Sequence, residues 1–167
     1  LERENSANEI RQSGLSMVLD GVEYSMQKVQ VVSSLHQALE QTPFDLGVLA
    51  IKSFDTRAFV ENLSPLKNKA PTLLCLQNGV ENEALLRQEI GKEKVISGSV
   101  TSAVGRIKAG RIILEKLRGI GVAGDTPMID DLITIFNHAG LYARKYGNET
   151  SMKWSKLLTN LLANASA

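Results

Sequence analysis

The chain has 167 residues, of which 43% are hydrophobic and 22% are charged, proportions that are typical of a folded globular protein. Its formal net charge is +1, from 19 basic and 18 acidic residues, so no net field favours nucleic acid or a membrane surface. The longest apolar runs, such as residues 46–51, fall far short of the roughly 20 residues that span a bilayer. We therefore expect no nucleic acid and no membrane among the partners.

Cysteine and histidine are scarce in this sequence. The single cysteine, Cys75, lies in an apolar run, which suits a small buried side chain in a reducing compartment, so we expect a cytoplasmic protein. With only His36 and His138 and no clustered cysteines, the sequence offers no ligand set for a metal, and we expect none. The chain opens on Leu1 and stops at Ala167 inside a helical pattern, so it reads as an excerpt.

The first part of the sequence predicts a helix followed by a hairpin. The helix covers residues 6–13 and stops at Gly14, a residue that suits a helix C-terminus. Two short strands, at residues 15–19 and 22–24, flank Asp20-Gly21, a dipeptide that favours a two-residue hairpin turn.

Strand patterns then alternate with helical patterns. The expected elements are a strand at 29–32, a helix that is capped by Ser33 or Ser34 and runs to Gln41, and then strands at 44–51, 72–76 and 95–101 with helices at 55–66 and 81–90 between them. The apolar run at 44–51 is typical of a strand buried on both faces of a parallel sheet. This alternation predicts right-handed crossovers and an open sheet whose ligands bind at the carboxyl ends of the strands.

The last part of the sequence predicts an edge hairpin, two helices and a final strand. The expected elements are an antiparallel hairpin of residues 112–114 and 120–122 at the sheet edge, a helix at 128–138 ended by Gly140, a strand at 141–146, and a helix that follows Gly147-Asn148.

This last helix carries a polar stripe. Lys156, Asn160 and Asn164 recur every four residues, so each step adds about 40° around the axis and all three share one side. The stripe is flanked by Trp154, Leu157, Leu158, Leu161 and Leu162. Because little of the helix surface is left for water, we expect an ammonium and two amides to be half-buried together. Such groups need internal partners or a polar ligand, and a solvated stripe is the alternative.

Polar residues also follow the buried strands. Lys52 comes directly after an apolar strand, so its flexible side chain can reach an anionic cofactor at the strand ends, although a solvated loop lysine looks the same. Gln77-Asn78-Gly79 reads as a tight turn, since Asn and Gly tolerate left-handed backbone angles, and it can be nothing more than a turn. Small residues at 99–103 would let a cofactor approach the backbone.

Three segments together resemble the ketopantoate reductase (2-dehydropantoate 2-reductase) family: W-S-K-L-L-T-N-L-L-A-N from Trp154, IKSFD at 51–55 and CLQNGVENE at 75–83. The resemblance spans nearly the whole chain. It implies an α/β fold in which residues 1–147 form part of a Rossmann-like NADP-binding domain, a mostly parallel sheet with flanking helices. Residues 148–167 would begin an all-α C-terminal domain. The implied activity is the NADPH-dependent reduction of a small keto acid, 2-dehydropantoate, to (R)-pantoate for pantothenate and coenzyme A biosynthesis.

The resemblance also assigns a role to individual residues. Lys156 would be the catalytic residue, which stabilises the alkoxide and donates a proton. The residues implied at the substrate are Asn78, Asn160, Asn164 and Lys52. The residues implied at the cofactor are Lys52, Asn78, Ala103 and Arg3, with Arg3 at the 2′-phosphate of NADPH. Arg11 is a rival for that phosphate, because any arginine offers the same guanidinium fork.

The sequence departs from the family pattern in two ways. No G-x-G-x-x-G occurs in it, and the helical half that follows the Lys-Asn-Asn helix in the family is missing. We therefore expect the isolated chain to bind NADPH poorly and to be inactive. A related 2-keto-acid reductase and a non-catalytic nucleotide-binding module stay open as alternatives, as does a homodimer of the full-length protein.

Overall fold

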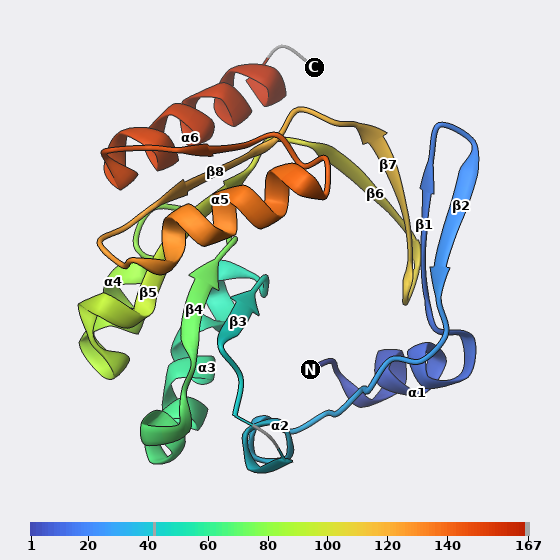
Figure 1. Ribbon diagram of the computed structural model, residues 1–167, viewed down its shortest axis with the longest axis horizontal. Helices are drawn as coiled ribbons and strands as arrows, with labels where there is room; N and C mark the ends of the chain where they lie inside the picture. Colours follow the sequence, from blue (N-terminus) through green and yellow to red (C-terminus); the bar gives the residue numbers. More distant parts are fainter. Residues whose placement is uncertain (42, 166–167) are drawn as a thin grey trace. The chain divides into compact units, whose positions relative to one another are not determined.

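The computed structural model describes residues 1–41 and 43–165, with the side chains of all of these except Gln41 and residues 163–165. The chain forms two compact units, one of residues 1–42 and 102–118 and the other of residues 43–101 and 119–167. Each unit is built around one β-sheet (Figure 1). Within the described ranges no helix is long and apolar enough to cross a membrane.

The first unit is a four-stranded sheet with the order β2-β1-β7-β6. Its strands are β1 (Leu15–Leu19), β2 (Val22–Met26), β6 (Ala103–Lys108) and β7 (Arg111–Lys116), and its helices are α1 (Glu4–Ser13) and α2 (Leu35–Gln41). The predicted end of α1 at Gly14 is confirmed, and of the two candidate caps Ser34 accepts a hydrogen bond from the Gln37 N–H of α2 at 3.4 Å.

The predicted hairpin at Asp20-Gly21 is confirmed. Both residues have the positive φ angles, +50° and +79°, that a tight hairpin turn needs, and β1 pairs antiparallel with β2. The strand predicted at 29–32 is wrong. The carbonyl of Val31 accepts a hydrogen bond from the Arg11 side chain of α1, and that of Val32 accepts one from the N–H of Glu2, two residues before α1. These carbonyls therefore bond to α1 and to the residues just before it, and not to a neighbouring strand.

The second unit is a five-stranded sheet with the order β3-β4-β5-β8-β9. Its strands are β3 (Leu46–Leu49), β4 (Thr72–Cys75), β5 (Val95–Val100), β8 (Ile120–Ala123) and β9 (Ala143–Lys145). Its helices are α3 (Thr56–Leu63), α4 (Asn82–Ile90), α5 (Met128–His138) and α6 (Glu149–Ala165), with 3-10 turns at Ser53–Asp55, Ser64–Lys69 and Lys92–Lys94. Strands β3, β4 and β5 are parallel, as predicted, whereas β8 pairs antiparallel with β5 and parallel with β9, so β8 and β9 both run opposite to the other three strands.

Both faces of this second sheet are covered by helices. Leu74, Ile96 and Val122 lie on one face and form a buried cluster with Ile129 and Leu132 of α5. On the other face the Ser97 hydroxyl bonds to side chains of α4 and α6. A mixed sheet with helices on both faces is the Rossmann-like architecture that the alternation predicted.

The antiparallel hairpin predicted from residues 112–114 and 120–122 is wrong. Strand β7 pairs with β6 and β1 in the first unit, whereas β8 lies between β5 and β9 in the second. The chain passes from one unit to the other between Arg118 and Gly119, so the glycine marks a change of sheet rather than a turn.

The expectation that the strand at 44–51 is buried on both faces is also wrong. Strand β3 is an edge strand of the described sheet, paired with β4 alone, and 57% of the Val48 side chain is exposed. An apolar run reports the character of a strand but not its position in the sheet.

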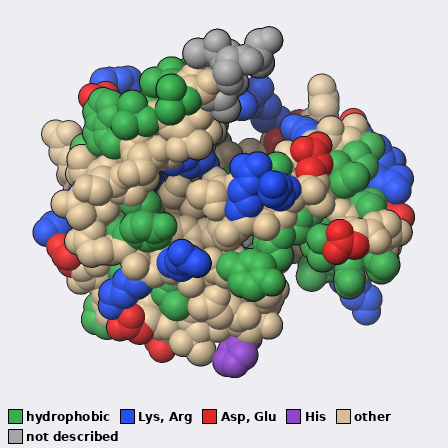
Figure 2. Space-filling model, turned by 90° about the horizontal axis from the view of Figure 1, so that it is seen from above, with side chains coloured by type: hydrophobic (Ala, Val, Ile, Leu, Met, Phe, Trp, Pro, Cys, Tyr) green, Lys and Arg blue, Asp and Glu red, His purple; other side chains and the backbone are tan. Residues whose placement is uncertain are grey.

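The expectation that the last helix, α6, has little surface in contact with water holds for part of its length only. Met152 and Lys153 are buried where α6 packs against strands β5 and β8 of the sheet. Farther along, hydrophobic side chains are exposed on the face of the molecule that α6 occupies (Figure 2). These side chains, between 47% and 72% exposed, are Trp154, Leu158, Leu161 and Leu162. The prediction that little of this helix meets water is therefore wrong in the structure.

Candidate functional site

Two of the predicted site residues follow neighbouring strands. Lys52 comes after β3 and Asn78 after β4, and because these strands are parallel their carboxyl ends meet at one edge of the sheet. The pairing extends beyond the strands through the Leu76 N–H, which donates to the Leu49 carbonyl at 2.9 Å. The side chains of Lys52 and Asn78 are both exposed. A ligand at this edge can reach both of them.

A buried chain of polar side chains lies beneath Lys52 and Asn78. The Gln77 amide donates to the Thr56 hydroxyl at 2.8 Å and to the Lys52 carbonyl at 3.4 Å, and the Thr56 hydroxyl donates to Asn82 at 2.9 Å. Gln77, Thr56 and Asn82 are each at most 5% exposed. Buried polar groups in a connected network stabilise one arrangement of the backbone.

The same network fixes the turn that carries Asn78. Its carbonyl accepts hydrogen bonds from the Asn82 amide at 2.9 Å and from the Ser53 hydroxyl. Gly79 completes the turn with φ of +98°, where a Cβ would lie 3.3 Å from both of these donor side chains. The turn therefore favours glycine, because another residue would adopt this positive φ only with strain and would crowd the two donors. The side-chain amide of Asn78 stays exposed, on a backbone that these hydrogen bonds hold in place.

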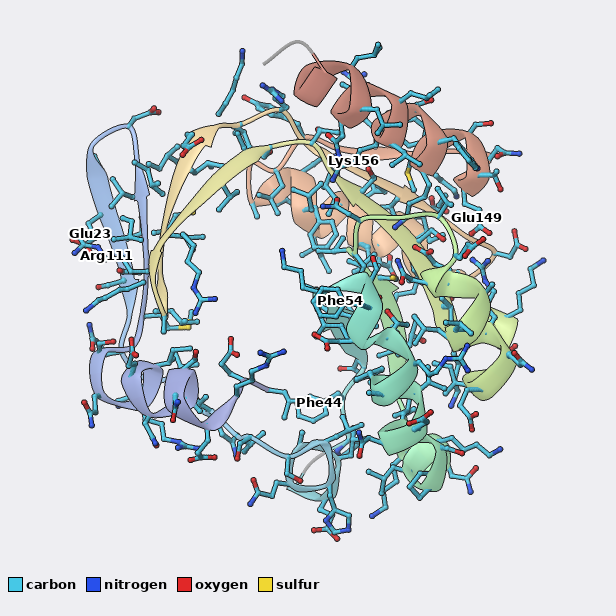
Figure 3. All side chains as sticks on the ribbon, turned by 180° about the vertical axis from the view of Figure 1, so that it is seen from behind. Glu23, Phe44, Phe54, Arg111, Glu149 and Lys156 are labelled. Atoms are coloured by element: carbon cyan, nitrogen blue, oxygen red, sulfur yellow. The ribbon has the colours of Figure 1, made fainter. Side chains whose placement is uncertain are left out.

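Lys156 reaches the end of β5, the strand next to β4 in the sheet. Its ammonium donates to the carbonyl of Val100, the last residue of β5, and the side chain is half-buried. Figure 3 shows it on the side of α6 that faces the sheet, with Glu149 in the first turn of the same helix. Burial, and then the positive charge of Lys153, lower the pKa of Lys156 below its usual value. A lowered pKa makes an ammonium a better proton donor.

Sequence reasoning missed Lys153, the most buried charged residue of this helix among its described side chains. Its ammonium lies 2.6 Å from the Glu83 carboxylate, with the two side chains 6% and 5% exposed, and it donates to the Gln77 carbonyl at 2.9 Å. One signal was available: Lys153 lies three residues before Lys156 and so extends the polar stripe backwards by one turn.

The other predicted site residues lie farther along α6 or in the first unit. Asn160, one turn beyond Lys156, is exposed rather than half-buried, and the side chain of Asn164 lies outside the described residues. Arg3 and Ala103 belong to the first unit, where Arg3 is exposed at the start of α1 and Ala103 begins β6. Arg11, the rival of Arg3, bonds to side chains of its own helix, Asn8 and Glu4.

The lone cysteine lies under the same turn. Cys75, the last residue of β4, is fully buried, and its thiol donates to the Gln77 side chain at 3.2 Å. Burial raises the pKa of this thiol to about 12, so it stays protonated and inert near neutral pH. Cys75 is thus a packing residue, as its apolar surroundings predict. No cluster of potential metal ligands occurs among the side chains that the structure describes.

Comparison with known proteins gives a consistent result. A family model described as "Ketopantoate reductase PanE/ApbA" matches residues 1–126. The 2-dehydropantoate 2-reductase of Streptococcus pyogenes serotype M6 is 24% identical over 166 residues, which cover 97% of this chain and 52% of that protein. The corresponding protein of Pyrococcus horikoshii is 27% identical over 125 residues, 72% of this chain and 40% of that protein. The chain spans about half the length of the curated relatives it matches.

Solved structures match the fold over nearly the whole chain. The 2-dehydropantoate 2-reductase of Geobacter metallireducens superposes with a TM-score of 0.80 at 25% identity, over 96% of this chain and 53% of that one. A PanE/ApbA family ketopantoate reductase of Ralstonia eutropha gives 0.79 at 26% identity, over 95% and 51%. D-mandelate dehydrogenase, solved with NADH and anilino(oxo)acetate, shares the fold at 19% identity with a TM-score of 0.72, over 93% and 50%.

Proposed function

Because the chain belongs to the ketopantoate reductase PanE/ApbA family, we propose that it is the cofactor-binding part of an NADPH-dependent 2-dehydropantoate 2-reductase. The product would be (R)-pantoate, for pantothenate and coenzyme A biosynthesis in the cytoplasm. One observation carries the proposal: Lys52, Asn78 and Lys156 gather at the carboxyl ends of three neighbouring strands of one sheet. That edge is where open α/β sheets bind their ligands.

The exposed groups at this edge fit an anionic nucleotide with a carboxamide. NADPH, when bound, supplies the hydride for the ketone carbon. Lys52 offers an ammonium to the cofactor and Asn78 an amide to both cofactor and keto acid, each from a backbone fixed by the buried network. We assign Arg3 to the 2′-phosphate, because its guanidinium fork matches phosphate geometry, and Ala103 to the cofactor as a small residue.

Lys156 is the proposed catalytic residue. As hydride reaches the ketone, negative charge develops on the carbonyl oxygen, and an ammonium beside it stabilises that charge and donates the proton. Its lowered pKa favours this transfer, and its half-buried position strengthens the electrostatic interaction. Asn160 and Asn164, one and two turns farther along α6, would bind the hydroxyl and carboxylate groups of the keto acid, together with Lys52 and Asn78.

The proposal is tested by steady-state assays of the full-length protein. NADPH oxidation is followed with 2-dehydropantoate, and Lys156→Ala is expected to lower kcat by about 10²-fold, or about 3 kcal/mol, with little change in NADPH affinity. Lys145→Ala, which removes a lysine paired with Asp130 at an exposed site of the same unit, is the matched control. Normal turnover by Lys156→Ala would exclude the catalytic role.

A related 2-keto-acid reductase is the second candidate. It is favoured by the modest 24% identity to the Streptococcus pyogenes relative and by the fold shared with D-mandelate dehydrogenase, which was solved with NADH. Assays with a panel of 2-keto acids, each with NADPH and with NADH, separate the candidates. A kcat/KM that is highest for another keto acid, or for NADH, would replace the first assignment.

A further inference from the structure

The Lys153–Glu83 ion pair joins three elements at the turn that carries Asn78. Lys153 comes from α6, Glu83 from the first turn of α4, and the carbonyl that Lys153 also contacts belongs to Gln77, two residues after the end of β4. Both charged side chains are almost completely buried. Two charges have therefore been removed from water at a point one residue away from a proposed ligand-binding side chain.

The contacts of this pair complete the support of the turn. The Asn78 carbonyl is held from one side by Asn82 and Ser53, as described above. The preceding carbonyl, that of Gln77, is held from α6 by Lys153. Both carbonyls that flank the Asn78 side chain thus accept hydrogen bonds from fixed donors, and one of these donors lies on the helix that carries Lys156.

Stability alone gives a weak reason for such a pair. Desolvation of two charges offsets most of their attraction, and well-packed apolar side chains of similar volume often stabilise a fold as much or more. A buried ion pair is better explained where it selects one geometry. Lys153 and Lys156 lie one turn apart on α6 and donate to Gln77 and Val100, at the ends of adjacent strands.

We propose that Lys153 and Glu83 are positioning residues that hold the Asn78 turn at a fixed place relative to the Lys156 side of α6. Glu83 orients the Lys153 ammonium, and Lys153 holds the Gln77 carbonyl. The pair touches neither substrate nor cofactor in this role. Its effect on the reaction rests on the proposed function, whereas its effect on the turn does not.

The decisive variant is the double replacement Lys153→Met/Glu83→Met in the full-length protein. It removes both buried charges and leaves unbranched side chains of similar length, so neither charge stays buried without a partner. We expect a melting temperature equal to or above that of the unmodified protein. Amide hydrogen exchange in a peptide that spans residues 76–80 should nevertheless become at least about tenfold faster than the change in global stability explains. Turnover per folded molecule should fall by about tenfold or more, because the reacting groups lose their fixed geometry.

Two further variants complete the experiment. Lys145→Met breaks an ion pair with Asp130, whose side chains are 52% and 74% exposed, and should leave both exchange and turnover unchanged. Lys153→Met alone leaves Glu83 unpaired and tests whether the turn loosens when the donor is lost. If this single variant does not fold, the double variant still decides.

The outcomes separate the two proposals. Unchanged exchange at residues 76–80 in a folded double variant would overturn the positioning role, as would an increase that only follows a lower global stability. An unmodified protein that reduces no 2-keto acid would overturn the proposed function, and the exchange measurement would still decide whether the pair holds the turn.

Discussion

Two ion pairs bridge α4 and α6, with opposite polarity and very different surroundings. On α4 the partners are Glu83 and Arg87, and on α6 they are Lys153 and Glu149, four residues apart on each helix. The Glu83–Lys153 pair is 5% and 6% exposed, whereas the Arg87 and Glu149 side chains are 20% and 33% exposed. One ion pair is therefore partly exposed to water at one end of the α4–α6 contact, and the other is buried at the opposite end.

What each pair holds differs as well. At the exposed end Arg87 makes a two-point contact with Glu149, and both side chains bond to the Ser97 hydroxyl of β5. This fixes the first turn of α6 on the middle of a strand. At the buried end Lys153 holds the carbonyl next to Asn78. The comparison suggests that the outer pair contributes to stability and the inner pair to geometry.

Breaking the inner pair from one side should have the largest effect on stability. Lys153→Ala leaves the Glu83 carboxylate buried without its partner, and the loss of one member of such a pair typically costs about 3–5 kcal/mol of the free energy of unfolding. Urea unfolding of the two proteins measures the difference. Lys145→Ala, at an exposed pair, should stay within about 0.5 kcal/mol of the unmodified protein. A similarly small loss for Lys153→Ala would mean that water reaches Glu83.

Breaking the outer pair should cost less. Glu149→Gln keeps the shape of the side chain and removes its charge, and because the site is partly exposed we expect a loss of about 1 kcal/mol at neutral pH. Urea unfolding again provides the measurement, now compared with Glu23→Gln, which removes the partner of Arg111 in the first unit at side chains that are 48% and 40% exposed. Equal losses in the two variants would contradict a special contribution of the bidentate contact.

The acid dependence of the outer pair follows from the pKa of Glu149. The hydrogen bond from Arg87, opposed by burial, holds this pKa below its ordinary value of 4.5. A carboxyl with a lowered pKa in the folded state contributes stability that is fully present above its unfolded pKa and is lost as pH falls through the folded one. Unfolding free energies of the unmodified protein and of Glu149→Gln should therefore converge in acid, while a constant difference would refute the linkage.

The sequence predicted most local features and fewer of the long-range ones. Apolar runs located the parallel strands, and glycines located the C-terminal ends of α1, α4 and α5, since these features depend on neighbouring residues. The positions of β3 at an edge and of β7 and β8 in different sheets depend on partners far along the chain, which a local pattern does not contain.

The candidate site shows the same division. Lys52, Asn78 and Lys156 could be selected as candidates from the sequence because each follows a recognisable strand or lies on a helical stripe. Lys153 was missed because an isolated lysine is usually solvated, and its buried partner Glu83 is 70 residues away. The exposure of Asn160 was missed because the stripe predicts which residues share a side of the helix but not how far the sheet covers it.

The smallest effect concerns the proton that Lys156 would donate. Its pKa is lowered first by burial and then by the positive charge of Lys153, one turn away on the same helix. The double variant Lys153→Met/Glu83→Met removes that charge, so the pKa of Lys156 should rise towards its usual value of 10.5. A general acid loses activity as pH rises through its pKa, so the alkaline limb of the kcat/KM profile should move to higher pH. Glu83→Gln, which keeps the Lys153 charge, is the matched control and should not produce this upward shift. A limb that moves to lower pH in the double variant would show that the inner pair acts on Lys156 through its position and not through its charge.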